Sequence, residues 1–378
     1  MVNEEYPALD GGEINQNPRS KKAFFKHAAE SGLQQPLLIA GPCSAETEAQ
    51  VMETAGLLAR IPGICALRAG IWKPRTRPDS FEGAGEPALY WLKAAGRETG
   101  LPVCTEVANA THAEKALKAG IDLLWIGART TVNPFSVQEI ADALRGTDVP
   151  VMVKNPVNPD TQLWLGAVER LEHAGLSDLA AIHRGFSTYA KTQYRNAPEW
   201  GIAIEFRRQK PHIPLICDPS HIAGKRTLVA HIAQKAMDLD YAGLMIETHP
   251  RPDEAWSDAM QQIRPDELAE LFTGLHFSRR LDGQGAHKEV LELLRRKIDT
   301  LDRQLLEILA ERMHTVGEIA GMKKQIGMAV LQMDRWADIF ETRIESGTDM
   351  GLNEVLIRRL IELIHLESIS LQEKIIRG

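Results

Sequence analysis

The sequence predicts an α/β fold, a (β/α)8 (TIM) barrel, followed by an all-helical domain. Between about residues 36 and 250, short apolar runs alternate with amphipathic stretches, as in repeated strand–helix units. The runs are apolar throughout, as expected of parallel strands buried on both faces. Eight runs favour a closed barrel over an open sheet, and no GxGxxG motif follows the first. The expected strands are residues 36–41, 64–70, 101–107, 122–127, 149–155, 179–185, 213–218 and 243–249.

Length and composition narrow the class of protein. A chain of 378 residues exceeds the usual size of one domain, so we expect two. With 44% hydrophobic residues and a net charge of −7, the chain is typical of a soluble protein without a nucleic-acid partner. No apolar stretch approaches the ~20 residues of a membrane span, and roughly the first 20 residues are too polar for a secretory signal. We interpret them as a loose arm. The cysteines lack paired spacing, which favours a reducing cytoplasm: Cys43, Cys65, Cys104 and Cys217.

The alternation ends in a glycine-containing segment at about residues 264–286, which indicates a joint. We therefore expect the barrel at 1–265, a linker at 266–286 and the helical domain at 287–378.

The first helix of the second domain is long. Its apolar residues are spaced by three and four as far as Ile308, and the pattern can continue to about Gln325. Such a helix would measure roughly 58 Å, whereas a compact domain of this size is about 35 Å across. It must break, for example at Gly317 or Gly321, or pack against a neighbouring domain or another chain. We favour a helix-exchanged homodimer.

Potential metal ligands follow several expected strands, where barrel enzymes place their catalytic groups. Cys43 follows the first strand, His221 the seventh, and Glu247 closes the eighth, with Asp258 eleven residues further on. One thiolate, one imidazole and two carboxylates suit a borderline divalent ion such as manganese, iron or zinc, which acts as a Lewis acid on a carbonyl. Taken singly, each residue also fits a structural role. Their joint placement favours a metal site.

Cations also close the strands. They outnumber the carboxylates available to neutralise them, although a lone strand-end cation is as often part of a surface ion pair. Arginine's planar fork suits phosphate, so the set predicts anionic, phosphorylated substrates. These cations are Arg68, Lys73, Arg75, Arg129, Lys154 and Arg184.

Seven motifs resemble the type I 3-deoxy-D-arabino-heptulosonate-7-phosphate (DAHP) synthases of the β branch, which is related to 3-deoxy-D-manno-octulosonate-8-phosphate synthases. They are GPCS, LRAGIWKPRTRPDSFEG, Ala128-Arg129, VKNP, IHRGFS, CDPSH and MIETHP, and the resemblance covers residues 36 to about 262. It implies a shikimate-pathway condensation of phosphoenolpyruvate with erythrose 4-phosphate at a divalent metal, with Mn²⁺ favoured over Fe²⁺, Zn²⁺ or Co²⁺.

The resemblance also implies residue roles. The metal ligands would be Cys43, His221, Glu247 and Asp258. The phosphate of phosphoenolpyruvate would be held by Arg129, beside Ala128, and by Lys154 and Arg184. Arg68 and Lys73 would lie near its carboxylate and reacting carbon, and Glu106 beside its double bond. Erythrose 4-phosphate would be received by Arg75 and Thr76.

The KPRT loop separates the two related chemistries. Octulosonate synthases carry an asparagine-containing loop there, so that alternative is disfavoured but stays open. Arg77 departs from the usual serine. As mechanism, we expect Lys73 to transfer a proton to the nascent alkoxide, because a lysine in a cationic cluster should have a lowered pKa.

The helical segment beginning LRRKIDTLDRQLLEILAERMHTVGEIAGMKK resembles the AroQ-type chorismate mutases as far as residue 378. The resemblance implies conversion of chorismate to prephenate, with Lys323 and Gln372 as donors to the breaking ether oxygen. It implies that Arg295 reaches into the partner subunit's site. The remaining implied ligands are Arg312, Arg335 and Ser368.

Two positions of the helical segment depart from that family. Trp336 stands in place of a usual acidic residue, and Gln332 in place of a common aspartate. A regulatory module that binds prephenate or chorismate and inhibits the barrel is therefore a second hypothesis.

Overall fold

The computed structural model describes residues 24–25, 36–73, 81–189, 191–276 and 286–377, with backbone alone at 286–289 and 333–335. The chain divides into two compact units, Met1–Arg279 and Arg280–Gly378. We describe each unit separately.

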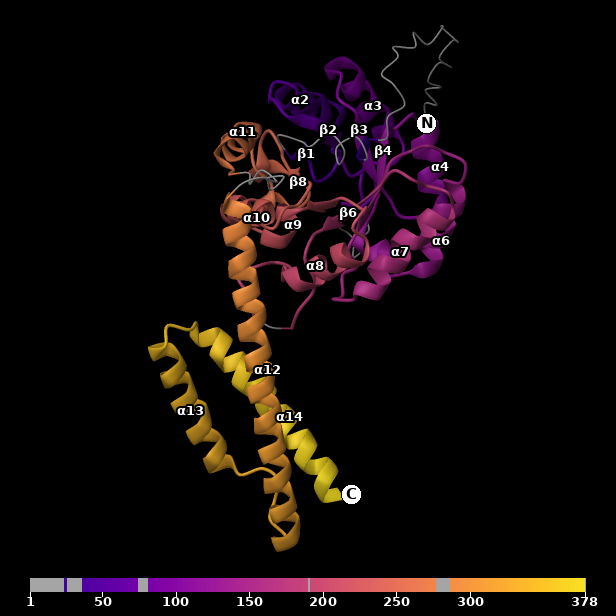
Figure 1. Ribbon diagram of the computed structural model, residues 1–378. Coiled ribbons are helices and arrows are strands. Elements are labelled where there is room, and N and C mark those ends of the chain that lie inside the picture. The colour runs from indigo at the N-terminus through magenta and orange to yellow at the C-terminus, as the bar shows by residue number, and fades with distance from the viewer. Residues whose placement is uncertain (1–23, 26–35, 74–80, 190, 277–285, 378) are drawn as a thin grey trace. The chain divides into compact units, whose positions relative to one another are not determined.

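Eight parallel strands form a closed barrel in chain order, which confirms the predicted fold (Figure 1). In the register, Gly41 lies beside Glu247, which brings the segment after the first strand next to the end of the last. The strands are β1 Leu37–Gly41, β2 Ile64–Arg68, β3 Val103–Val107, β4 Leu123–Ile126, β5 Val151–Lys154, β6 Leu179–His183, β7 Leu215–Cys217 and β8 Gly243–Glu247.

Helices lie between the strands and surround the barrel. Several begin at a polar side chain that accepts a backbone N–H of the first turn, as Thr47, Asn109 and Asp160 do. The helices of this unit are α2 Glu48–Leu58, α3 Pro87–Thr99, α4 Ala110–Lys118, α5 Ala128–Thr131, α6 Pro134–Ala143, α7 Thr161–His173, α8 Trp200–Gln209, α9 Pro219–Ala223, α10 Arg226–Asp238 and α11 Pro265–Gly274, with short 3₁₀ turns η1 Pro252–Glu254 and η2 Ala259–Gln261.

Side chains of successive strand residues point alternately into the barrel and outward, which produces two apolar layers. Leu37 and Ile39 point into a cluster with Trp125 and Met152, whereas Leu38 packs in the outer layer with the helices. The inner cluster makes the barrel a packed core, so its chemistry is confined to the rim.

Helix α11 lies at the expected domain boundary. The linker was expected to begin at residue 266, but α11 occupies Pro265–Gly274 and buries Leu268 and Phe272 in the outer layer of the barrel. Pro265 takes the first helical position, and Glu267 accepts the backbone N–H of Arg264. The expected linker residues 277–285 lie outside the described residues.

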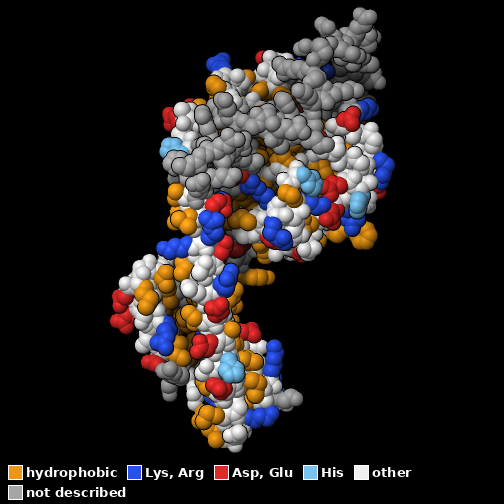
Figure 2. Space-filling view, in the orientation of Figure 1, with side chains coloured by type: hydrophobic (Ala, Val, Ile, Leu, Met, Phe, Trp, Pro, Cys, Tyr) orange, Lys and Arg blue, Asp and Glu red, His pale blue; other side chains and the backbone are white. Residues whose placement is uncertain are grey.

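The second unit consists of α12 Ala286–Ile326, α13 Met333–Asp349 and α14 Glu354–Arg377, with α14 packed against both other helices. Helix α12 runs without a break through Gly317 and Gly321. Many apolar side chains of α12 are not packed against the other helices of the unit. Figure 2 shows hydrophobic side chains on the surface of this unit. The exposed fractions are 49–63% for Leu291, Leu294, Ile298, Leu301, Leu305 and Ile308. No helix among the described residues is both long and apolar enough to cross a membrane.

Candidate active site

Three of the four predicted metal ligands converge at the carboxyl end of the barrel. Cys43 follows β1, Glu247 ends β8, and Asp258 lies between η1 and η2. One ligand atom of each lies within 4.8 Å of the others. The Cys43 thiol donates to Asp258 Oδ2 at 3.3 Å. Sulfur and two carboxylates held this close fit a divalent ion.

Side chains outside the predicted set hold these ligands in place. Arg195 donates to Asp258 Oδ1 at 3.1 Å and to Gln261 Oε1 at 2.6 Å. Gln261 in turn donates to Glu247 Oε2 at 2.7 Å. Reasoning from strand ends missed Arg195 and Gln261, because Arg195 lies in the loop after β6 and Gln261 in η2, both well past a strand. The only signal is their sequence proximity to barrel-rim motifs.

His221 lies beside the three ligands. Its Nε2 is 3.7 Å from Glu247 Oε1, and its Nδ1 is 2.8 Å from Asp218 Oδ2. Asp218 also caps α9 by accepting the His221 backbone N–H. Burial lowers the pKa of His221, with Lys154 acting in the same direction, against the opposite effect of Asp218. A ring fixed through Nδ1 by a carboxylate is the usual arrangement for a metal-binding histidine.

The environment of Lys73 contradicts the sequence-based expectation. Its Nζ lies 2.9 Å from Cys43 Sγ and 3.1 Å from the Cys43 carbonyl. Burial alone would lower its pKa, but Cys43, Glu247 and Glu106 outweigh that effect, and the pKa is raised. The prediction of a lowered pKa was wrong because it considered the cations that close other strands, whereas the fold surrounds this ammonium with the Cys43 thiol and with carboxylates.

Arg68 is the most completely buried cation of the rim. Its side chain is 1% exposed, and its Nη2 lies 3.1 Å from Glu247 Oε1. The guanidinium lies over the ring of Trp125, 4.9 Å from the centroid. Within the described part of the chain, its Nε and Nη1 have no hydrogen-bond partner. Two buried N–H donors without acceptors are costly unless an anion occupies the site.

The other predicted groups occupy the same rim. Lys154 pairs with Asp218 at 2.8 Å, both buried. Burial lowers the pKa of Arg184 to about 10, and Arg195 and Arg129 act in the same direction. Glu106 accepts the indole N–H of Trp125 at 3.0 Å. Arg129 is exposed and Ala128 half-buried at the start of α5, and Arg75 and Thr76 lie outside the described residues.

In the helical unit, the structure brings together part of the predicted set. Arg312 Nη1 donates to Ser368 Oγ at 2.8 Å, with Gln372 buried one turn along α14. Lys323 Nζ donates to the carbonyl of Val330 at 2.6 Å. The Arg335 side chain lies outside the described residues.

Arg295 stands apart from Arg312. It is exposed and paired with Glu292, and 17 residues of continuous helix separate it from Arg312, or roughly 25 Å. The two arginines therefore cannot meet on one chain.

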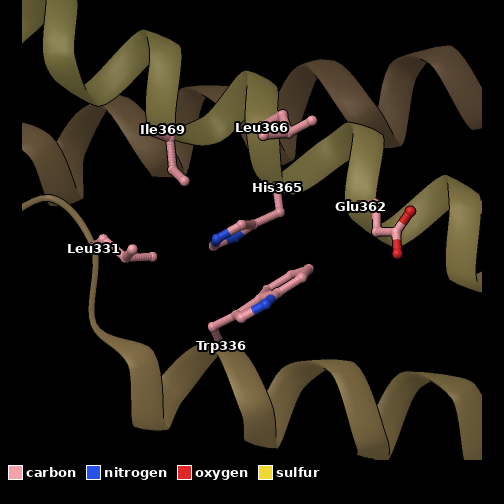
Figure 3. Close-up of a pocket in the computed structure, with 6 residues that line it drawn as sticks. All are labelled: Leu331, Trp336, Glu362, His365, Leu366 and Ile369. Atoms are coloured by element: carbon pink, nitrogen blue, oxygen red, sulfur yellow. The ribbon is translucent and has the colours of Figure 1, made fainter. Parts of the chain in front are cut away.

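A hollow of about 320 Å³ opens between α13 and α14. Figure 3 shows the rings of Trp336 and His365 facing each other within it. They stack with centroids 3.8 Å apart and planes 20° apart. Burial, then Arg312, lowers the pKa of His365. The hollow is lined by Leu331, Trp336, Glu362, His365, Leu366 and Ile369.

A closed (β/α)8 barrel with buried cations beside thiol and carboxylate groups at one rim defines a barrel enzyme built for anionic substrates. Residues 20–276 match the model of the DAHP synthetase I family, and the chain belongs to that family. Residues 294–373 match the chorismate mutase type II model.

Two individual relatives are similar to part of this chain. A phospho-2-dehydro-3-deoxyheptonate aldolase of Thermotoga maritima is 34% identical over 226 residues, 60% of this chain and 64% of that protein. The chain thus spans less than two thirds of that relative. A 2-dehydro-3-deoxyphosphooctonate aldolase of Alkalilimnicola ehrlichii is 29% identical over 65% of this chain and 91% of its own.

Two solved structures are also similar to about two thirds of this chain. A crystal structure of the Thermotoga maritima phospho-2-dehydro-3-deoxyheptonate aldolase (DAHP synthase) superposes with a TM-score of 0.57 at 30% identity, covering 63% of this chain and 67% of that one. A truncated form of 3-deoxy-D-arabino-heptulosonate 7-phosphate synthase from the same organism gives 0.55 at 28% identity, covering 63% and 84%.

Proposed function

We propose that the barrel condenses phosphoenolpyruvate with erythrose 4-phosphate to DAHP and phosphate. The observation that carries this proposal is the buried Arg68 guanidinium, with two N–H groups that lack acceptors among the described residues. A small anion such as a carboxylate supplies the charge and the acceptor that those donors lack.

Phosphoenolpyruvate has two anionic groups, a carboxylate and a phosphate, and it would bridge the cations of the rim. Its carboxylate would pair with Arg68, and its phosphate with Arg184, Lys154 and Arg129. Arg184 supports this role because burial and neighbouring cations lower its pKa, so an added phosphate relieves an unfavourable charge. Arg75 and Thr76 would receive the second phosphate, that of erythrose 4-phosphate.

A divalent ion would be held by Cys43, His221, Glu247 and Asp258. Mn²⁺ is the first choice, with Fe²⁺, Zn²⁺ or Co²⁺ as alternatives for this mixed donor set. When bound, the ion would supply Lewis-acid polarisation of the aldehyde carbonyl.

The chemistry then divides among the reactants and this chain. C3 of phosphoenolpyruvate attacks the aldehyde carbon, water adds at C2, and phosphate leaves. Lys73 is the proposed proton donor to the new alkoxide, because its Nζ is held at the ligand cluster, 2.9 Å from Cys43 Sγ. Glu106, held by the Trp125 indole, would face the double bond.

Phosphate release by the purified chain tests this proposal and its nearest alternative. With Mn²⁺ and phosphoenolpyruvate present, erythrose 4-phosphate should support turnover and arabinose 5-phosphate should not. Turnover with arabinose 5-phosphate alone would instead identify an octulosonate synthase.

We infer that the helical unit converts chorismate to prephenate as a homodimer. The Arg312–Ser368 contact and the buried Gln372 supply part of an anion site. The distance from Arg312 to Arg295 requires the latter to come from a second chain. The apolar residues of α12, half exposed within one chain, supply the surface for that pairing.

A second role for the helical unit is favoured by the Trp336–His365 stack. Trp336 replaces an acidic group, and the ring pair fills part of the hollow beside Arg312. A unit that binds prephenate or chorismate and inhibits the barrel would tolerate this change better than a mutase. Loss of chorismate absorbance with the full chain distinguishes the two roles. A pure regulator would leave chorismate intact while prephenate slows phosphate release.

We also propose a cytoplasmic location, because all four cysteines are free thiols.

A further inference from the structure

We propose that Asn196 is a positioning residue that couples the phosphate-binding guanidinium of Arg184 to the helix that carries His221. Asn196 lies in the loop after β6, thirteen residues beyond the end of that strand. The inference rests on the proposed function, and it assigns a task to a side chain outside the proposed substrate and metal ligands.

The amide of Asn196 bridges two elements of the site. Its Oδ1 accepts from Arg184 Nη1 at 2.7 Å, and its Nδ2 donates to the backbone carbonyl of His221 at 2.6 Å. Each amide group faces a partner of the matching kind. The side chain is 8% exposed, so water does not readily replace either bond.

The backbone around Asn196 is held on both sides. The Asn196 N–H donates to the carbonyl of Ile222 in α9, and neighbouring Ala197 pairs with Phe186 after β6. On the β6 side, Gly185 has φ +78, and a Cβ there would come within 2.9 Å of Asn196 Cβ. Only glycine permits this close approach. The segment is therefore held by backbone contacts to both α9 and the Arg184 loop.

This connection has a consequence for binding. Metal binding fixes the His221 ring and hence α9, and α9 fixes Asn196, which aims Arg184 at the phosphate. Phosphoenolpyruvate should in turn tighten metal binding through the same path, because coupling between two sites is reciprocal.

Two neighbouring side chains provide matched controls. Asn155 Oδ1 accepts the Arg184 backbone N–H at 2.7 Å, and its amide donates to the carbonyls of Pro156 and Gly185, so its side-chain hydrogen bonds to the described residues do not reach α9. Gln261 donates to Glu247 and accepts from Arg195, and it does not hydrogen-bond to Arg184. Asn155 thus contacts the phosphate side, and Gln261 the metal side.

The experiment measures dissociation constants of phosphoenolpyruvate and of Mn²⁺ by calorimetry on the full chain. Asn196→Ala should weaken both by about tenfold, the effect of losing a hydrogen bond to a charged group or leaving one buried partner unmatched. Asn155→Ala should weaken phosphoenolpyruvate binding alone, and Gln261→Ala should weaken Mn²⁺ binding alone. The isosteric Asn196→Asp, which lacks the donor to His221, should also weaken both ligands and covers the case in which the alanine variant fails to fold.

The outcomes separate the inference from the proposed function. If the wild-type chain binds no phosphoenolpyruvate, the proposed function fails. If it binds both ligands and the folded Asn196 variants weaken one or neither, the coupling role of Asn196 is overturned.

Discussion

The hydroxyl of Tyr241 donates to Nδ1 of His183 across 2.9 Å inside a buried aromatic cluster. The opposite ring nitrogen, Nε2, donates to the carbonyl of Pro198 at 2.6 Å. Because a carbonyl can only accept, Nε2 carries a proton, and Nδ1 of the neutral ring is then the acceptor for Tyr241; protonation would turn Nδ1 into a donor and lose that bond. Burial lowers the pKa of His183 from 6.5 to about 4, with Arg184 acting in the same direction and the Pro198 carbonyl opposing it.

His183 makes the folded barrel sensitive to acid. In the unfolded chain its pKa is near 6.5, so between pH 6.5 and pH 4 the unfolded state binds more protons than the folded state. Stability from this residue is therefore lost as the pH falls through that window, by about 2 to 3 kcal/mol. Urea unfolding at pH 7 and pH 4.5, compared between wild type and His183→Gln, should show a smaller loss in the variant. Equal losses would refute this reading.

Arg68→Lys keeps the charge of the rim but removes the planar fork. We expect kcat/KM for phosphoenolpyruvate to fall by about 10- to 150-fold, the effect of losing one hydrogen bond to a charged group. Steady-state phosphate release measures it. Arg145→Lys, the same exchange at an exposed pair with Asp142, serves as control and should leave kcat/KM within error. Matching values for both variants would remove Arg68 from the phosphoenolpyruvate site.

Metal removal should separate the two activities of one chain. Chelation with EDTA is expected to abolish phosphate release and to leave chorismate conversion unchanged, because the only ligand cluster found among the described residues belongs to the barrel. Added Mn²⁺ should restore the first activity. The chorismate assay thus reports within the same sample that the protein is still folded. Undiminished condensation in metal-free protein would contradict the metal role.

Mixing two inactive variants tests the shared mutase site. Arg295→Ala and Arg312→Ala should each lack chorismate conversion. After unfolding and joint refolding, a mixed dimer has one intact site, with Arg312 from one chain and Arg295 from the other, so part of the activity should return. Refolded single variants are the controls. A mixture as inactive as its components would show that the two arginines serve no common site.

The sequence predicted the barrel well because its signal is local. Each strand is a continuous apolar run, and each ends at the rim, so Cys43 and Glu247 could be placed at one face without coordinates. Near the predicted boundary at 266 the apolar positions of RPDELAELF are few, and only the fold shows that Leu268 and Phe272 pack in the outer layer of the barrel.

Other features of the site depend on contacts between distant segments. The surroundings of Lys73 come from Cys43, thirty residues away, and from Glu247 on the last strand. Trp125 looked like one more core residue in an apolar run, yet its ring lies under Arg68 and its N–H holds Glu106. Asn196 and Arg195 follow no strand directly, so no rule about strand ends selects them.

Asp218 performs several tasks with one carboxylate: it caps α9, neutralises Lys154 and orients His221. Such sharing restricts how a lineage can drift. If the proposed metal role holds, a descendant that functioned without a metal would no longer need the imidazole, but it would still carry the buried Lys154 ammonium, which requires a counter-charge. We therefore expect such a descendant to retain Asp218 even where His221 has been replaced.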